Sequence, residues 1–256
     1  MTRSSAVLPA NLILLLSLTL PGVGAAQGLP ALAPLNPVAS SRSSLYFHPF
    51  RDPAPGKWMT TVALDYASVI EYNRLDRADY VLDSEILRLG VGVSRDIGQR
   101  AFLELSAGFH GAYAGFLDGV LDWYHGALGI RISERESRPQ DHFLYSIALP
   151  DGPRVNRNRS DLFLGDLIAG VGFRYNRSLQ SLLSVTLPTS TGPDGYGKGV
   201  PSIGLLNTVR APLSPRLMYE GSLGVGLTPS HGPLADLQHT TFLAVSSGLR
   251  QKIWGS

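Results

Sequence analysis

Three polar side chains that could do chemistry recur along one face of a predicted helix. Residues 116–125 read Phe-Leu-Asp-Gly-Val-Leu-Asp-Trp-Tyr-His, which spaces Asp118, Asp122 and His125 at i, i+4 and i+7. Two carboxylates and an imidazole could bind a divalent cation or act as general acid and base. The same pattern also fits a short amphipathic helix that covers a barrel mouth with its apolar side. No other His-rich segment accompanies the cluster, so we predict no metal and no other cofactor.

Other catalytic templates are absent from the sequence. A serine hydrolase needs a nucleophile held by a base and an oxyanion site, and no nucleophile elbow accompanies the serines and the six His. The glycine-rich stretch 192–199 with Lys198 lacks the Gly-Lys-Ser/Thr sequence and the following helix of a phosphate cradle, which favours a hairpin loop. We therefore predict that the protein is not an enzyme. The alternative is an outer-membrane hydrolase of lipid or peptide that uses Asp118, Asp122 and His125.

The segments around this helix alternate apolar and polar side chains with a period of two. In residues 166–175, for example, Leu167, Val171 and Phe173 alternate with glycines and with Arg174. We expect the polar faces of such segments to line the interior of a barrel. The charged residues on those faces are Asp65, Arg88, Glu104, Asp166, Arg174 and Glu220.

The connectors between these segments alternate short and long. The short joins are 96–99, 176–178 and 211–216, and the long ones are 111–125, 150–164, 188–199 and 228–237. Strands of about ten residues with tight turns on one side and longer loops on the other are typical of outer-membrane barrels. We predict an all-β fold: a transmembrane antiparallel up-and-down β-barrel of about ten strands with one short loop helix. One predicted strand occupies 126–133. If a closing hairpin is missing after Ser256, the barrel would have about twelve strands.

A soluble β-sandwich would show the same alternation. Other features must therefore indicate whether the apolar faces meet lipid or a protein core. Glycines gather on the polar faces, which suits a curved wall with a crowded interior. The apolar faces carry no charge, and a charge facing lipid at the midplane costs about 2–4 kcal/mol. Aromatic residues near strand ends fit an interfacial girdle: Trp58, Tyr72, Tyr80, Tyr145, Tyr175 and Tyr219. The alternative is a periplasmic ligand-binding barrel with its apolar face turned inward.

The beginning of the chain predicts export. Arg3 precedes an apolar run from Asn11 to Leu20, and the small residues before Gln27 offer a cleavage site, so residues 1–26 read as a signal peptide. The apolar run is shorter than the ~20 residues of a spanning helix. Residues 27–57 are Pro-rich and read as a periplasmic lead-in, and 58–256 form the barrel domain. The aromatic residues of the lead-in, Tyr46, Phe47 and Phe50, are expected to close the barrel mouth, to lie at the membrane interface or to dock a partner.

Composition narrows the class of protein further. The chain of 256 residues has no Cys and a net charge of +2, so neither a disulfide framework nor a nucleic-acid partner is expected. A barrel of about ten strands should have a narrow or occluded pore. We expect a monomeric outer-membrane protein acting as a narrow channel or as an envelope structural protein. Its partners would be outer-membrane lipid, lipopolysaccharide near the basic patch 154–159, and the barrel-assembly machinery.

Four short motifs resemble an uncharacterised bacterial family, the domain of unknown function 3187. They are the run Asp-Gly-Val-Leu-Asp-Trp-Tyr-His-Gly-Ala-Leu-Gly-Ile from Asp118, Leu-Pro-Asp-Gly from Leu149, Leu-Gly-Asp-Leu from Leu164, and Leu-Pro-Thr-Ser-Thr-Gly from Leu187. The resemblance implies an exported outer-membrane barrel and brings no activity with it. Ser190 and Thr191 split the family's Pro-Thr-Gly element, and the chain ends short of the family's last strands.

Overall fold

The computed structural model describes residues 31, 33–35, 47–75, 78–130, 138–148, 155–158, 161–193, 196–231, 235 and 240–251. The predicted signal peptide lies outside these residues, as do Tyr46 and the two ends of the basic patch, Arg154 and Arg159. The elements are β1 (Trp58–Leu75), β2 (Ala78–Ile97), β3 (Ala101–Tyr113), α2 (Asp118–Leu128), β4 (Leu144–Ala148), β5 (Val155–Arg157), β6 (Leu162–Leu164), β7 (Leu167–Arg174), β8 (Leu179–Leu187), β9 (Ser202–Ser214), β10 (Leu217–Leu227) and β11 (Thr241–Gln251).

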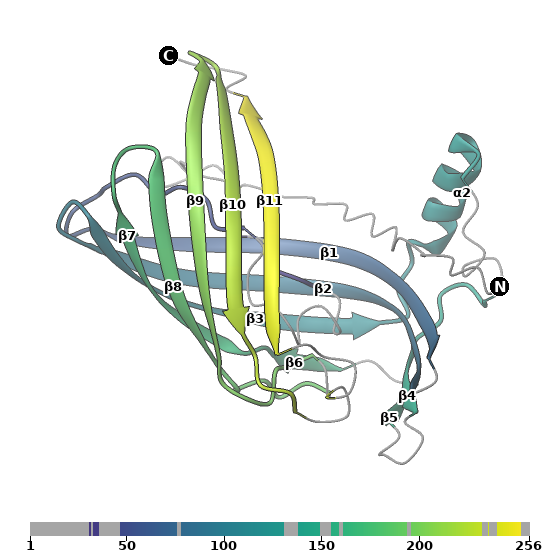
Figure 1. Cartoon of the computed structure of the whole chain (residues 1–256). Helices are drawn as coiled ribbons and strands as arrows, with labels where there is room; N and C mark the ends of the chain where they lie inside the picture. Colours follow the sequence, from purple (N-terminus) through teal and green to yellow (C-terminus); the bar gives the residue numbers. More distant parts are fainter. Residues whose placement is uncertain are drawn as a thin grey trace, which may run out of the picture. The chain divides into compact units, whose positions relative to one another are not determined.

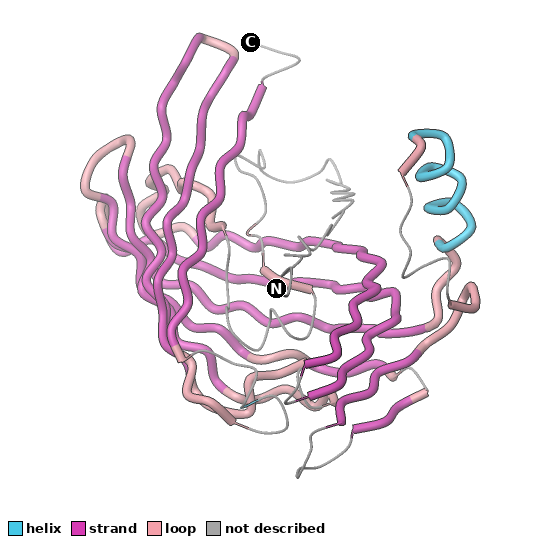
Figure 2. The backbone as a smooth tube through the Cα atoms, turned by 45° about the vertical axis from the view of Figure 1, so that its right-hand side comes forward, coloured by secondary structure: helices cyan, strands magenta, loops and turns pink. Residues whose placement is uncertain are grey.

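The eleven strands form one sheet, and the strand pairs with an assigned register are antiparallel. Their order is β11-β10-β9-β8-β7-β3-β2-β4-β5, with β1 paired to β2 and β6 paired to β3 (Figure 1). The prediction of a mostly antiparallel β-structure with one short helix is thus confirmed (Figure 2). Within the described residues no pairing joins β1 to β11, so the sheet is not closed into a barrel. No helix of this part of the chain is long and apolar enough to cross a bilayer.

Two details of the predicted elements are wrong. The strand predicted over 126–133 begins inside α2, which runs on to Leu128. Gly129, at φ 68°, ends the helix and donates its backbone N–H to the Gly126 carbonyl, as a left-handed C-terminal glycine does. The predicted strand length also fails at the start of the sheet, because β1 has 18 residues and β2 has 20.

The chain divides into two compact units. The described parts of the first lie within Tyr66–Leu87 and Ala112–Asp161, and those of the second lie within 31–65, Arg88–Gly111 and 162–251. The first unit has a conventional apolar core. Tyr80 is 7% exposed and Tyr145 is 2% exposed there, so the prediction that these two belong to an exposed aromatic girdle is wrong.

The second unit exposes its apolar face. One row of side chains runs in direct register from strand to strand across β3 and β7 to β11, and each member is between 38% and 69% exposed. We call these six residues the apolar row: Leu103, Val171, Leu183, Leu205, Val225 and Leu243. The strands that carry most of it, β7 to β11, run side by side in Figure 1.

The opposite face of the same strands is polar and buried. The strand-to-strand partners Arg174, Gln180, Thr208 and Ser222 form one polar row across β7 to β10, and none is more than 5% exposed. Phe102 is fully buried on this face opposite Gly172, where a Cβ atom would lie 1.9 Å from the ring atom Cζ. Glycine there leaves room for the ring, which explains one glycine of the polar face.

Candidate functional site

The helix with the acid-base candidates is anchored by a carboxylate from β2. The N-cap residue Leu117 makes no side-chain cap, and Glu85 takes that role. The buried Glu85 carboxylate accepts the backbone N–H of Leu117 at 2.6 Å and that of Phe116 at 3.0 Å. A carboxylate at this position satisfies free N–H groups and complements the positive end of the helix dipole.

Asp118, Asp122 and His125 lie on α2, as predicted. The carboxylates of the two aspartates, however, accept hydrogen bonds from a loop. Asp118 is buried and accepts the backbone N–H of Asp141 at 2.9 Å, and Asp122 accepts the side-chain amide of Gln140 at 2.8 Å. His125 is buried in the last turn. Among the described residues no group of three His, Cys, Asp or Glu could hold a metal ion. The geometry suits a helix docked on residues 140–141.

All six charged residues predicted on the polar faces lie in the second unit, and each is tied to a partner. Asp65 accepts from Arg88 Nε and Nη2 at 2.8 and 2.6 Å. Glu220 is 1% exposed and lies 3.0 Å from Arg250. The other three partners are His48 for Glu104, Asp96 for Arg174, and the backbone N–H groups of Ser190 and Lys198 for Asp166.

A segment of the lead-in crosses the polar face of the second unit, and we call residues 47–54 the strap. Gln180 accepts the Arg51 backbone N–H at 2.9 Å and donates to the Pro49 carbonyl at 2.8 Å. Thr208 donates to the His48 carbonyl at 2.8 Å. The strap aromatics Phe47 and Phe50 are 5% and 3% exposed. The strap is therefore fixed along the polar row by β8 and β9.

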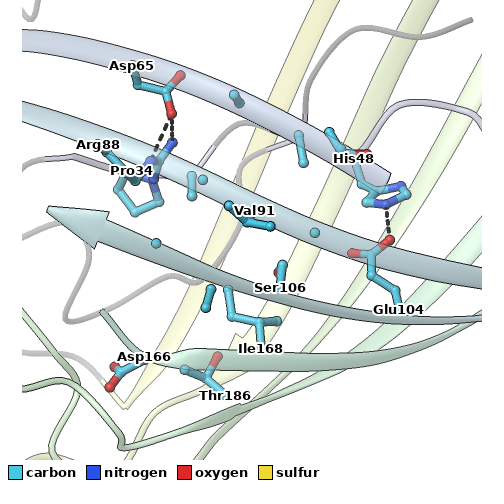
Figure 3. A pocket seen from close by; sticks show the side chains of 18 of the residues that line it. Pro34, His48, Asp65, Arg88, Val91, Glu104, Ser106, Asp166, Ile168 and Thr186 are labelled. Atoms are coloured by element: carbon cyan, nitrogen blue, oxygen red, sulfur yellow. Dashed lines mark hydrogen bonds and ion pairs between the residues drawn. The ribbon is translucent and has the colours of Figure 1, made fainter. Parts of the chain in front are cut away.

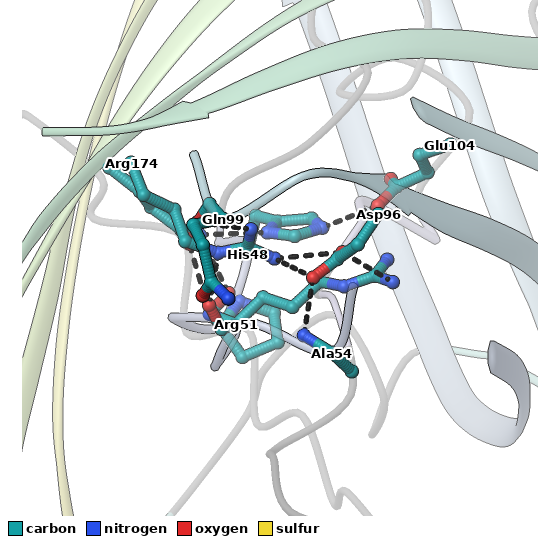
Figure 4. Close-up of polar contacts among 9 residues, drawn as sticks. His48, Arg51, Ala54, Asp96, Gln99, Glu104 and Arg174 are labelled. Atoms are coloured by element: carbon teal, nitrogen blue, oxygen red, sulfur yellow. Dashed lines mark hydrogen bonds and ion pairs between the residues drawn. The ribbon is translucent and has the colours of Figure 1, made fainter. Parts of the chain in front are cut away.

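Asp96 joins the strap to the strands. Its fully buried carboxylate lies 3.0 Å from Arg51 Nη2 and accepts from Arg174 Nη2 at 2.9 and 3.0 Å (Figure 4). It also accepts the backbone N–H of Ala54 at 2.6 Å. Both guanidinium groups stack over the Phe102 ring, at 5.0 and 4.8 Å from its centroid. One carboxylate thus balances two cations that both lie near the same aromatic ring.

A cavity of about 200 Å³ opens on the polar face of this unit, beside the strap. Its wall includes two ion pairs, Asp65 with Arg88 and His48 with Glu104, the latter 2.7 Å apart (Figure 3). Lys198 also lines it. The cavity therefore joins charged side chains of the strands, the strap and the loop after β8.

Lys198 is the buried cation of that loop. It is 6% exposed, and its ammonium lies 3.5 Å from the Thr228 hydroxyl. Burial lowers the pKa of Lys198 to about 8, and the negative charge of Asp166 limits the fall. The side chain is therefore mostly protonated at neutral pH and within reach of deprotonation in mild alkali.

Five of the six predicted polar-face residues lie in strands, and Asp166 lies between β6 and β7. Sequence reasoning missed several of their partners. Asp96 continues the even-numbered polar face of β2 that starts at Arg88, and it was overlooked because the strand was ended early. No periodicity marks His48 or Arg51, because both lie in the irregular strap. Lys198 was noticed only as part of a glycine-rich loop.

Fold and site together define an antiparallel β-sheet protein that exposes apolar side chains on one face and buries a charged network on the other. The model of the family described as protein of unknown function (DUF3187) matches residues 27–190, well over half of the chain, and the chain belongs to this family. The resemblance seen in the four short motifs is thereby confirmed. Neither the curated proteins nor the solved structures contain a match to the chain.

Proposed function

We propose that this protein is an outer-membrane β-barrel of the Gram-negative envelope whose interior is occluded by the strap, so that it acts as a narrow channel. The observation that carries the proposal is the inverted burial of the second unit. The apolar row faces outward, while Asp65, Asp96, Arg174 and Glu220 are each at most 3% exposed on the other side. A water-soluble sheet protein buries the opposite set.

Free energy supports lipid as the medium for the apolar row. Fully burying a Val or Leu side chain contributes about 1.5–3 kcal/mol, so half-exposed members would gain roughly 1 kcal/mol each in hydrocarbon. A periplasmic barrel with an apolar interior would need these side chains to point inward, which is opposite to their exposure. The hydrolase alternative has weaker support, because Asp118 and Asp122 already accept hydrogen bonds from residues 140–141.

The strap supports occlusion. It contacts Glu104 of β3, Gln180 of β8 and Thr208 of β9, so it spans the polar face that would line a pore. Hydrogen bonds of this kind contribute about 0.5–1.5 kcal/mol each, more where a charge takes part. Occlusion by the strap is then a property that a single substitution can weaken without changing the strands.

The test compares wild type with Gln180→Ala after refolding into detergent micelles. We expect a heat-modifiable band on gels for both proteins, and larger or more frequent conductance steps in planar bilayers for Q180A, which loses the contacts to Pro49 and Arg51. Ser184→Ala is the control, because its hydroxyl, on the same strand, bonds the Gly204 carbonyl and not the strap. Wild-type protein that folds and stays dispersed in buffer without amphiphile would overturn the membrane proposal. Equal conductance of wild type and Q180A would overturn occlusion by the strap.

A further inference from the structure

The cavity beside the strap contains an imbalance between donors and acceptors. Its three carboxylates are already satisfied: Asp65 by Arg88, Glu104 by His48, and Asp166 by backbone N–H groups at 2.7 and 3.0 Å. None of them needs a cation from solution. The wall is therefore poorly suited to capture a metal ion or an amine.

Lys198, in contrast to these carboxylates, has hydrogen-bond donors that lack acceptors in the part of the chain that the structure describes. Its ammonium has three protons to donate, and the single side-chain contact it makes to a described residue is the long one to Thr228 at 3.5 Å. The Asp166 carboxylate accepts the Lys198 backbone N–H at 2.7 Å and forms no ion pair with its ammonium in the described structure. A buried ammonium with unused donors needs an acceptor of negative charge.

His110 adds a second hydrogen-bonding side chain to the wall of the cavity. Its ring stacks on Phe163 at 5.1 Å between centroids, and Phe163 meets the Tyr196 ring at 5.0 Å, two residues before Lys198. His110 lines the cavity and forms no hydrogen bond with another described residue. Its Nε2 would lie only 2.6 Å from a Cβ atom on Gly165, the residue before Asp166. Glycine at this position leaves room for the imidazole.

We infer that this cavity is a binding site for a small oxyanion, a carboxylate or a phosphate, which the Lys198 ammonium holds by charge and His110 by a hydrogen bond. The volume of about 200 Å³ suits a small solute and not a polymer. Charge-assisted hydrogen bonds of this type are about twice as strong as neutral ones. The site would give the proposed channel a preference for anions, but binding itself requires no membrane.

The test is isothermal titration calorimetry of the folded full-length protein with sodium acetate and, separately, with sodium phosphate. We expect one of these anions to bind wild type, and Lys198→Met to weaken that binding at least tenfold. Lys198→Arg keeps the charge and should bind within a few-fold of wild type. Lys57→Met is the matched control, because Lys57 is exposed and lies outside the cavity, and it should bind as wild type does.

The two anions distinguish a carboxylate site from a phosphate site, and choline chloride tests for a cation. Three outcomes would overturn the inference: no heat of binding for either anion at millimolar concentration, equal binding by K198M and wild type, or binding of choline in place of the anions. If K198M does not fold, loss of binding in His110→Phe, compared with K198R, tests the same site. Failure here would leave the membrane proposal standing, because that proposal is tested by folding and conductance.

Discussion

At the scale of single residues, Asp96 has the largest structural consequence. Its carboxylate is fully buried and contacts Arg51 and Arg174, one from the strap and one from β7. Removing one partner of a buried ion pair leaves an uncompensated charge, which costs more than the pair itself contributes. Here two guanidinium groups beside Phe102 would be left without their shared carboxylate.

We therefore expect Asp96→Asn to lower the free energy of unfolding by about 3 kcal/mol or more. Urea titration of the micelle-bound protein, followed by tryptophan fluorescence, measures this. Asp52→Asn is the comparison, because Asp52 also pairs with an arginine, Arg210, but its side chain is 45% exposed. Its loss should stay below about 1 kcal/mol. Equal losses in the two variants would contradict the role given to Asp96.

Lys198 predicts a pH dependence of anion binding. Its pKa of about 8 means that the ammonium is charged below pH 8 and neutral above it, with Asp166 as the charged residue that acts on it. Because an anion needs the charged form, acetate affinity should fall about tenfold between pH 7 and pH 9. Calorimetry across this range measures the fall. Lys198→Arg should remove it, since a guanidinium stays charged throughout. A flat profile in wild type would contradict the prediction.

Asp52 predicts a second pH effect, on the strap. Its hydrogen bond to Arg210, 3.0 Å from Nη1, together with the charge of that arginine, holds the pKa of Asp52 below its usual 3.8. A lowered folded pKa means that the pairing stabilises the strap above pH 3.8 and is lost as pH falls through the folded value. Amide exchange of residues 47–54 should rise in that acid range. Asp52→Asn should show the faster exchange already at pH 6, with a smaller further change in acid.

At the scale of elements, how much could be predicted depends on periodicity. Alternation correctly separated the two faces of β7 and β10, because side chains of a strand alternate strictly. Spacing also placed the α2 candidates on a helix, but it could not show that loop residues use their carboxylates. The strap's contacts with β8 and β9 were beyond prediction, since they join residues more than a hundred positions apart and leave no local pattern.

Glycines on the polar face of the strands differ in what they accommodate. A Cβ atom on Gly172 would overlap the Phe102 ring, whereas one on Gly90 would have its nearest neighbour at 3.8 Å. Gly172→Ala should destabilise the protein by about 1–3 kcal/mol, the usual effect of overpacking. Gly90→Ala should change stability by less than about 0.5 kcal/mol. The same urea titration compares them, and a Gly90→Ala loss as large as that of Gly172→Ala would contradict this account.

At the scale of the whole molecule, the proposal requires that lipid, and not water, surrounds the apolar row. Val225 sits between Leu205 and Leu243 on neighbouring strands and is 44% exposed. In a bilayer, Val225→Arg should cost about 2–4 kcal/mol, because the charge would meet hydrocarbon. Ser214→Arg, at the exposed end of β9, should cost less than about 0.5 kcal/mol. Urea unfolding in lipid vesicles measures both. A tolerated V225R would mean that water, and not lipid, surrounds the row.

The strap is synthesised early, but it can form its contacts only late in folding. His48 is synthesised before any strand, yet its carbonyl is held by Thr208, which lies 160 residues later. Contacts of such long range form late, because the intervening chain must first be brought together. The strap thus leaves the ribosome before β8 and β9 but is among the last segments to reach its native contacts. A nascent chain would carry Phe47 and Phe50 uncovered until β8 and β9 have joined the sheet.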